Sequence, residues 1–101
     1  MNYRLLGPAQ LDVFDGIDFY EQKQTGLGQK FADAVAAFIR RIVVHPRLYG
    51  RVHRSPRGRD IRQSVLKKFP FLVVYEVTMT EVVILSVTHA RSVRRPWRRR
   101  I

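Results

Sequence analysis

Residues 71–89 read FLVVYEVTMTEVVILSVTH, and this stretch decides the fold class. Two runs rich in β-branched and aromatic side chains are joined by a short polar link at residues 78–80, which predicts an antiparallel β-hairpin. Side chains alternate between the two faces of a strand, so one face of the hairpin should be apolar along its whole length. That face should carry Phe71, Val73, Tyr75 and Val77, met across the pair by Val83, Leu85 and Val87.

Two helical patterns precede the hairpin and can cover its apolar face. The first follows Gly7 and Pro8, and proline suits a first helical turn because its missing N–H would be unpaired there. Gly16 should weaken this helix slightly. The second pattern ends before Pro46. Apolar side chains recur at three- and four-residue steps in both: Leu11 or Val13, Phe14, Ile17 and Tyr20 or Glu21 in the first, opposite Asp12, Asp15 and Asp18, and Leu27, Phe31, Val35, Phe38 and Ile42 in the second.

Together these patterns predict an α+β fold in one domain of 101 residues. Helices near residues 8–22 and 27–45 should form an antiparallel hairpin that packs on one face of a small, twisted, mainly antiparallel sheet. The sheet should be built mainly from residues 59–90, and NYRLL and DIRQSVL are further strand patterns. The predicted core contains Phe31, Val35, Phe38, Val73, Tyr75 and Leu85.

Several classes of protein are not indicated by this composition. The chain has no cysteine, so neither a disulfide framework nor a thiolate metal site is expected. His45, His53 and His89 lie far apart in the sequence without the spacing of metal ligands, and no cofactor is expected. No apolar run approaches the roughly 18 residues of a membrane-spanning helix, and the start MNYRLLGPAQ lacks the apolar stretch of a signal peptide. We therefore expect a cytoplasmic protein.

The net charge of +11 lies entirely in the second half of the chain. Residues 1–46 contain five basic and five acidic side chains, whereas residues 47–101 contain fourteen basic and three acidic ones. Residues 45–60 (HPRLYGRVHRSPRGRD) have five arginines and no periodicity, which predicts a long basic loop; such loops are uncommon unless they bind something or stay partly disordered. The C-terminal tail, residues 91–101 (RSVRRPWRRRI), has six arginines and the only tryptophan. This charge indicates a polyanionic target, an acidic protein partner, or both.

The order of strand, two helices, basic loop and three strands resembles the RelE/ParE family of bacterial type II toxin–antitoxin toxins, which includes plasmid stabilisation proteins. Four segments in the order of the family carry the resemblance, which is closer on the ParE side: GLGQKF, the HP that follows the second helix, IRQSVLKKFPFLVVYEV and ILSVTHARSVRRPW. The resemblance implies a helical hairpin on a small antiparallel sheet. It also implies a cognate antitoxin whose acidic tail folds around the toxin, giving a hetero-oligomer.

RelE-like toxins cut messenger RNA on the ribosome, so they must activate the ribose 2′-OH, neutralise the charged transition state and protonate the leaving oxygen. Here the strand position that would offer a cation falls at or beside Leu72, in an apolar run, and Trp97 has no hydroxyl to donate. The nearest usable set is Arg62, His89 and Arg91, with Lys67 and Lys68 close by in sequence.

ParE-like toxins instead stall DNA gyrase and need no catalytic set, so the resemblance favours a gyrase inhibitor that is not an enzyme. A ribosome-dependent endoribonuclease is the alternative. A non-toxic, basic nucleic-acid-binding module is a third possibility, although no known docking motif is present.

The candidate contacts to target or antitoxin also have structural interpretations. His89 at a strand end can simply be hydrogen-bonded to nearby backbone, and Lys67 and Lys68 can protect a sheet edge. Trp97 can cap the sheet, or it can anchor a partner. We expect the arginine-rich tail and loop to receive chiefly an acidic antitoxin segment, with phosphate as the rival ligand. The candidate binding residues are Arg62, Lys67, Lys68, His89, Arg91, Arg94, Arg95, Trp97 and Arg98.

Overall fold

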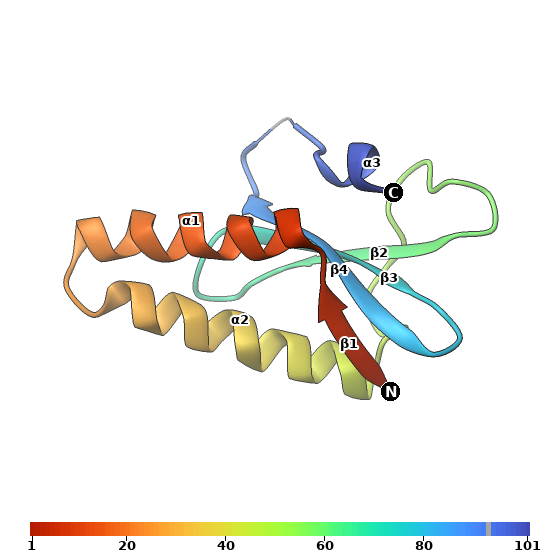
Figure 1. The fold of residues 1–101 in the computed structure, drawn as a ribbon, viewed down its shortest axis with the longest axis horizontal. Helices are drawn as coiled ribbons and strands as arrows, with labels where there is room; N and C mark the ends of the chain where they lie inside the picture. The colour runs from red at the N-terminus through yellow and green to blue at the C-terminus, as the bar shows by residue number, and fades with distance from the viewer. Residues whose placement is uncertain (93) are drawn as a thin grey trace.

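A computed structural model describes residues 1–92 and 94–101; Val93, within the predicted basic tail, lies outside the described residues. The elements follow in the order β1 (Asn2–Leu5), α1 (Gly7–Lys23), α2 (Leu27–Val44), β2 (Asp60–Val65), β3 (Phe71–Val77), β4 (Glu81–His89) and α3 (Trp97–Arg100). The four strands form one sheet in the order β1-β4-β3-β2, in which β1 runs parallel to β4 and the other neighbours are antiparallel. The predicted α+β class and strand assignments are confirmed (Figure 1).

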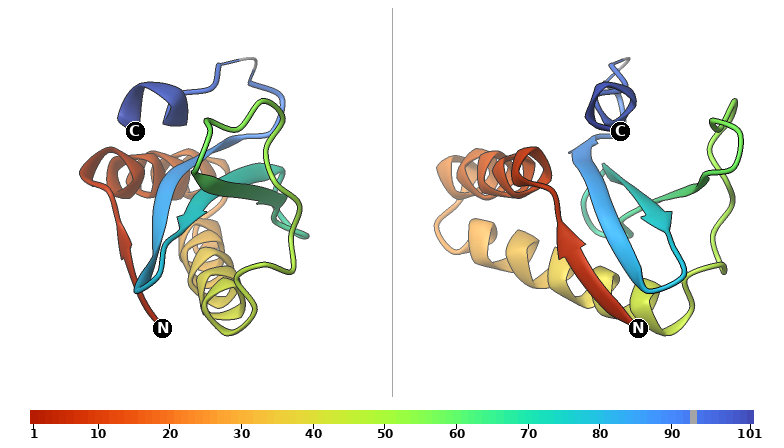
Figure 2. Two further views of the ribbon diagram at one scale, coloured as in Figure 1. Left: turned by 90° about the vertical axis from the view of Figure 1, so that its right-hand side faces the viewer. Right: turned by 45° about the vertical axis from the view of Figure 1, so that its right-hand side comes forward.

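Helices α1 and α2 form the predicted antiparallel hairpin against one face of the sheet (Figure 1). The loop before β2 lies on the other side of the sheet, as the right-hand view of Figure 2 shows. The turn between the helices is held by Glu21, whose carboxylate accepts the backbone N–H groups of Gly26 (3.0 Å) and Gly28 (3.0 Å). These are unpaired donors at the start of α2, so Glu21 caps that helix from the end of the preceding one.

The helix face of the sheet forms the larger hydrophobic core. Phe31 packs at 4.8 Å between ring centroids on Phe71 and at 5.4 Å on Phe69. All six residues predicted as core are buried: Phe31, Val35, Phe38, Val73, Tyr75 and Leu85. Among the described residues, no helix is long and apolar enough to cross a membrane.

The predicted buried side of α1 is wrong in part. Val13 and Tyr20 are buried as predicted, but Leu11 and Phe14 are exposed, and Ala9 and Gly16 are buried in addition. Gly16 explains the shift, because a Cβ there would lie 2.5 Å from the ring of Phe31. The absence of a side chain at Gly16 therefore lets the two helices approach closely. The sequence alone predicts only that Gly16 weakens the helix.

The predicted face of β4 is also wrong in part. Val83 and Leu85 lie on the face away from the helices, in a second cluster with Val74 and Trp97, while Val87 does face the helices. The cause is a register shift: Val74 pairs with Ser86 and Tyr75 pairs with Ile84, so Leu85 is an extra residue in β4. This β-bulge reverses the alternation of side chains along the strand.

Candidate functional site

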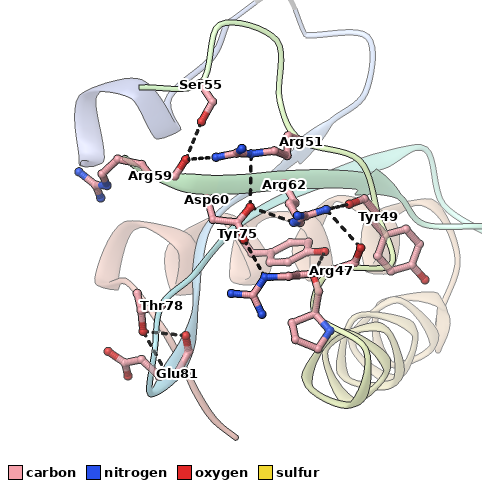
Figure 3. Close-up of polar contacts among 11 residues, drawn as sticks. Arg47, Tyr49, Arg51, Ser55, Arg59, Asp60, Arg62, Tyr75, Thr78 and Glu81 are labelled. Carbon is pink, nitrogen blue, oxygen red and sulfur yellow. Dashed lines mark hydrogen bonds and ion pairs between the residues drawn. The ribbon is translucent and has the colours of Figure 1, made fainter. Parts of the chain in front are cut away.

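The basic loop before β2 is tied to the sheet by a cluster of arginines around one carboxylate. Asp60 at the start of β2 accepts contacts from the Nε atoms of Arg62 (2.9 Å), Arg47 (3.1 Å) and Arg51 (3.4 Å) (Figure 3). The backbone N–H of Val52 also donates to the Ile61 carbonyl (2.9 Å), so the loop runs beside β2. The segment predicted as an irregular loop is therefore ordered by its own charges.

Arg62 works inside this cluster rather than at the surface. Its guanidinium donates to the carbonyls of Tyr49 (2.7 Å) and Arg47 (3.2 Å) as well as to Asp60, and its side chain is only 16% exposed. Beside it the Tyr75 hydroxyl donates to the Pro46 carbonyl (2.8 Å), and burial raises the pKa of Tyr75 to about 12. The phenol consequently stays protonated near neutral pH. Both side chains fix the loop, and Arg62 has little capacity left for a substrate or partner.

A second ion pair uses another arginine of the loop. Arg59 Nη2 lies 2.7 Å from Glu76 Oε1 on β3, and this hydrogen bond raises the pKa of Arg59. Of the five arginines in residues 45–60, three therefore pair with carboxylates of the chain itself. The side chains of Arg54 and Arg57 are exposed, and no hydrogen bond or ion pair from either side chain to another described residue is found.

His89 sits at the other end of the sheet, at the end of β4. Its ring packs edge-on against Phe71 (5.5 Å between centroids), and its Nδ1 accepts the backbone N–H of Arg91 (3.1 Å). The prediction that this histidine is hydrogen-bonded to nearby backbone is confirmed.

The structure does not bring Arg62 and His89 together. Arg62 pairs with Tyr75, and His89 pairs with Phe71, four residues away along β3. With about 3.3 Å per residue and about 4.8 Å between neighbouring strands, their Cα atoms are about 16 Å apart. Arg62 is held to Asp60 and the Tyr49 carbonyl and His89 packs on Phe71, so the two side chains do not converge on one site. In the part of the chain that the structure describes, no group of three or more His, Asp or Glu side chains could hold a metal ion.

The C-terminal tail folds back over the outer face of the sheet. Trp97 is 1% exposed and packs with Val74, Val83 and Leu85, so its interpretation as a cap on the sheet fits the structure, and its ring is not available to a partner in this conformation. We call residues 94–101 the strap.

Ordered contacts hold the strap in place. Arg100 pairs with Asp12 of α1 (2.7 Å) and donates to the Leu85 carbonyl at the bulge (2.8 Å). Arg98 lies over the Trp97 ring, 4.4 Å from its centroid, and donates to the His53 carbonyl of the loop (2.9 Å). Arg95 donates to nearby carbonyls of the tail, at Ser92 (2.8 Å) and Arg94 (3.0 Å).

A groove of about 790 Å³ runs between α2 and the β2–β3 turn. Its apolar lining includes Ala34, Phe38 and Leu66, and the predicted binding residues Lys67 and Lys68 stand on its rim. The edge of β2 is open beside the groove. The loop covers this edge only as far as Gln63, whose N–H donates to the Gly50 carbonyl, and Val65 further along the strand is 47% exposed. Sequence analysis did not find this groove, since its two walls are about 30 residues apart in the chain. The full lining is Leu27, Lys30, Asp33, Ala34, Ala37, Phe38, Arg41, Tyr49, Ser64, Val65, Leu66, Lys67, Lys68 and Phe69.

Comparisons with known proteins agree with this architecture. A family model described as "ParE toxin of type II toxin-antitoxin system, parDE" matches residues 3–94. A solved structure titled "Chromosomal ParDE TA system from P. aeruginosa" is similar with a TM-score of 0.67 and 21% sequence identity, covering 90% of this chain and 97% of that one. At that identity the likeness supports the fold. A search of curated proteins gives no match.

Proposed function

Because the chain belongs to the ParE toxin family of type II toxin–antitoxin systems, we propose that it stops growth by inhibiting DNA gyrase and that a cognate antitoxin neutralises it. The observation that carries the choice of gyrase over messenger RNA is the separation of Arg62 from His89. A ribonuclease needs a cation and a proton donor around one phosphate. Arg62 is instead committed to Asp60 and two carbonyls, Leu72 is apolar, and Trp97 is buried and has no hydroxyl.

Expression of the chain without antitoxin tests this choice. We expect growth arrest with induction of the DNA-damage response, inhibition of supercoiling by purified gyrase, and no cleavage of messenger RNA on purified ribosomes. His89→Ala should keep at least half of the gyrase inhibition, because the ring serves only local packing. Cleavage of ribosome-bound messenger RNA that His89→Ala abolishes in a folded protein would replace gyrase by RNA as the target.

The groove between α2 and β2 is the best-supported place for the antitoxin. It combines an apolar floor, an open strand edge at Val65 and a mostly cationic rim, and Asp33 is the one carboxylate among its described lining residues. An acidic segment with apolar anchors fits such a surface, because the anchors fill the floor and backbone groups can pair with the open edge. The strap offers no comparable apolar floor among its described residues, since Trp97 is buried and Ile101 is the one large apolar side chain exposed there. The cationic rim consists of Lys30, Arg41, Lys67 and Lys68.

Two neighbouring alanines of α2 give a matched test of the groove. Ala37 lines the groove, whereas Ala36 is exposed on the same helix and does not. Ala37→Glu should weaken antitoxin binding at least tenfold, about 1.4 kcal/mol, because it puts a negative side chain into the acidic partner's path. Ala36→Glu should change the affinity less than about threefold, since neighbouring helical positions point apart. Calorimetric titration with the cognate antitoxin measures both; equal effects of the two substitutions would remove the groove from the proposal.

A further inference from the structure

Two arginine-rich segments that are about 40 residues apart in sequence form one surface. Arg98 of the strap donates to the carbonyls of His53 (2.9 Å) and Arg54 (3.3 Å) in the loop, so the segments are joined directly. In Figure 1 they follow each other along the upper side of the molecule, with the connection after β4 at one end, α3 in the middle and the loop before β2 at the other end. The basic ridge is the set of exposed arginines of this surface for which no side-chain hydrogen bond or ion pair to another described residue is found: Arg54, Arg57, Arg91, Arg94 and Arg99.

The charge of the ridge is not balanced by the chain itself. Asp60 already pairs with three arginines, Glu76 with Arg59, and Asp12 with Arg100. For the five ridge side chains, no ion pair with any described carboxylate is found. The ridge therefore keeps a strong positive potential, which attracts anions and raises their rate of association.

The ridge is also presented on an ordered scaffold. Trp97 is buried beneath it, and Arg100 fastens the end of the strap to Asp12. Arg54 adopts a left-handed backbone conformation (φ 54°), which is uncommon for a residue with a side chain. The guanidinium of Arg98 donates a hydrogen bond to the Arg54 carbonyl and stabilises this conformation. A backbone held in this way needs less ordering on binding than the backbone of a disordered tail.

The chemistry of the ridge favours phosphate groups over an acidic peptide as its ligand. Of the large apolar side chains that are exposed in the described residues, Ile101 (39%) lies on the strap and Leu48 (66%) near the start of the loop, and the others lie on other elements. A folding peptide would therefore find few apolar anchors here. No exposed aromatic ring lies on the ridge either, because Trp97 is buried, and proteins that bind single strands stack bases on such rings. A duplex offers what this surface can contact, a regular series of phosphates.

We propose that the basic ridge binds the phosphate backbone of double-stranded DNA without reading its sequence. The proposal goes beyond inhibition of gyrase: it assigns the toxin a direct contact to duplex DNA, the substrate that gyrase holds. This contact would let the toxin engage the enzyme and its DNA together. Binding to the duplex alone can be measured in the absence of gyrase.

Fluorescence anisotropy with a labelled 20-base-pair duplex of mixed sequence tests the proposal. The ridge variant carries Arg57→Gln, Arg91→Gln and Arg94→Gln, and a control variant loses the same charge elsewhere through Arg4→Gln, Lys23→Gln and Arg40→Gln, three exposed side chains outside the ridge and the groove. Wild-type affinity should fall as salt rises, with a log–log slope of about −0.9 per phosphate contacted. The ridge variant should bind at least about tenfold more weakly, with a slope smaller in magnitude by about 2 to 3. The control should stay within about threefold of wild type.

Other outcomes count against the ridge. Equal affinity and slope for the ridge variant and the wild type would overturn the proposal, as would equal losses in both variants. Unchanged duplex binding with a loss of antitoxin affinity would show that the ridge serves an acidic peptide instead. Circular dichroism and thermal unfolding check that both variants fold. Inhibition of gyrase by the wild type tests the proposed function separately, so either idea can fail alone.

Discussion

Trp97→Ala is expected to lower the free energy of unfolding by about 3 to 5 kcal/mol. The ring is 1% exposed and, together with Val52 of the loop, covers Val74, Val83 and Leu85 on the outer face of the sheet. Removing it leaves a cavity under the strap and also takes away the ring beneath the Arg98 guanidinium. For a domain of this size the loss is a large part of the total stability.

Urea unfolding followed by far-ultraviolet circular dichroism measures the effect, because the variant has no tryptophan left for fluorescence. Arg99→Ala is the matched control, since this neighbouring side chain is exposed and should change stability by less than about 0.5 kcal/mol. Similar midpoints for wild type and Trp97→Ala would show that the strap is detached in solution.

The buried tryptophan also decides how the tail can be tested. Deleting residues 91–101 would remove Trp97 and Arg100 together with the exposed arginines, and the outer face of the sheet would lose its cover. A change in partner binding after that deletion could then come from unfolding alone. Substitutions limited to exposed arginines separate charge from stability, and for that reason the ridge variant keeps Arg95, Arg98 and Arg100.

Local periodicity was enough to predict the helices and the hairpin, because each depends on neighbours within a few residues. It could not place the faces of α1 and β4. The buried side of α1 is set by the contact of Gly16 with Phe31, which lies in another helix. The faces of β4 are set by the extra residue Leu85, which shifts the pairing of β4 with β3 by one position. A bulge cannot be recognised within a run of apolar side chains such as VVIL. Every residue of that run is apolar, so a shift by one position leaves both faces of the strand apolar.

The candidate site was predictable in composition but not in arrangement. Counting charges correctly identified a basic half, yet it could not show which arginines are already paired. Arg62 pairs with Asp60 two residues away, a local spacing that the sequence shows, whereas Arg100 pairs with Asp12 across 88 positions. The groove beside β2 was missed for the same reason, because it exists only where α2 lies next to the β2–β3 turn.

The pair of Asp12 and Arg100 should be the second large contribution to stability, because it closes the β4 bulge. Asp12 Oδ2 accepts the backbone N–H of Val87 (3.0 Å), and Arg100 donates to the Leu85 carbonyl (2.8 Å). The two side chains are 14% and 17% exposed. They therefore satisfy backbone groups that the register shift withdraws from the sheet, while they fasten the strap to α1.

Asp12→Ala should cost about 3 kcal/mol, because it leaves a mostly buried guanidinium without its carboxylate and the Val87 N–H without an acceptor. Asp15→Ala on the exposed side of the same helix is the control and should cost less than about 0.5 kcal/mol. Arg100→Met removes the other partner, and the double variant should be destabilised by at least about 1 kcal/mol less than the sum of the two single effects, because it leaves no charge unpaired. Urea unfolding of the four proteins measures the coupling. Strictly additive losses would show that Asp12 acts on Val87 alone and that Arg100 does not hold the strap.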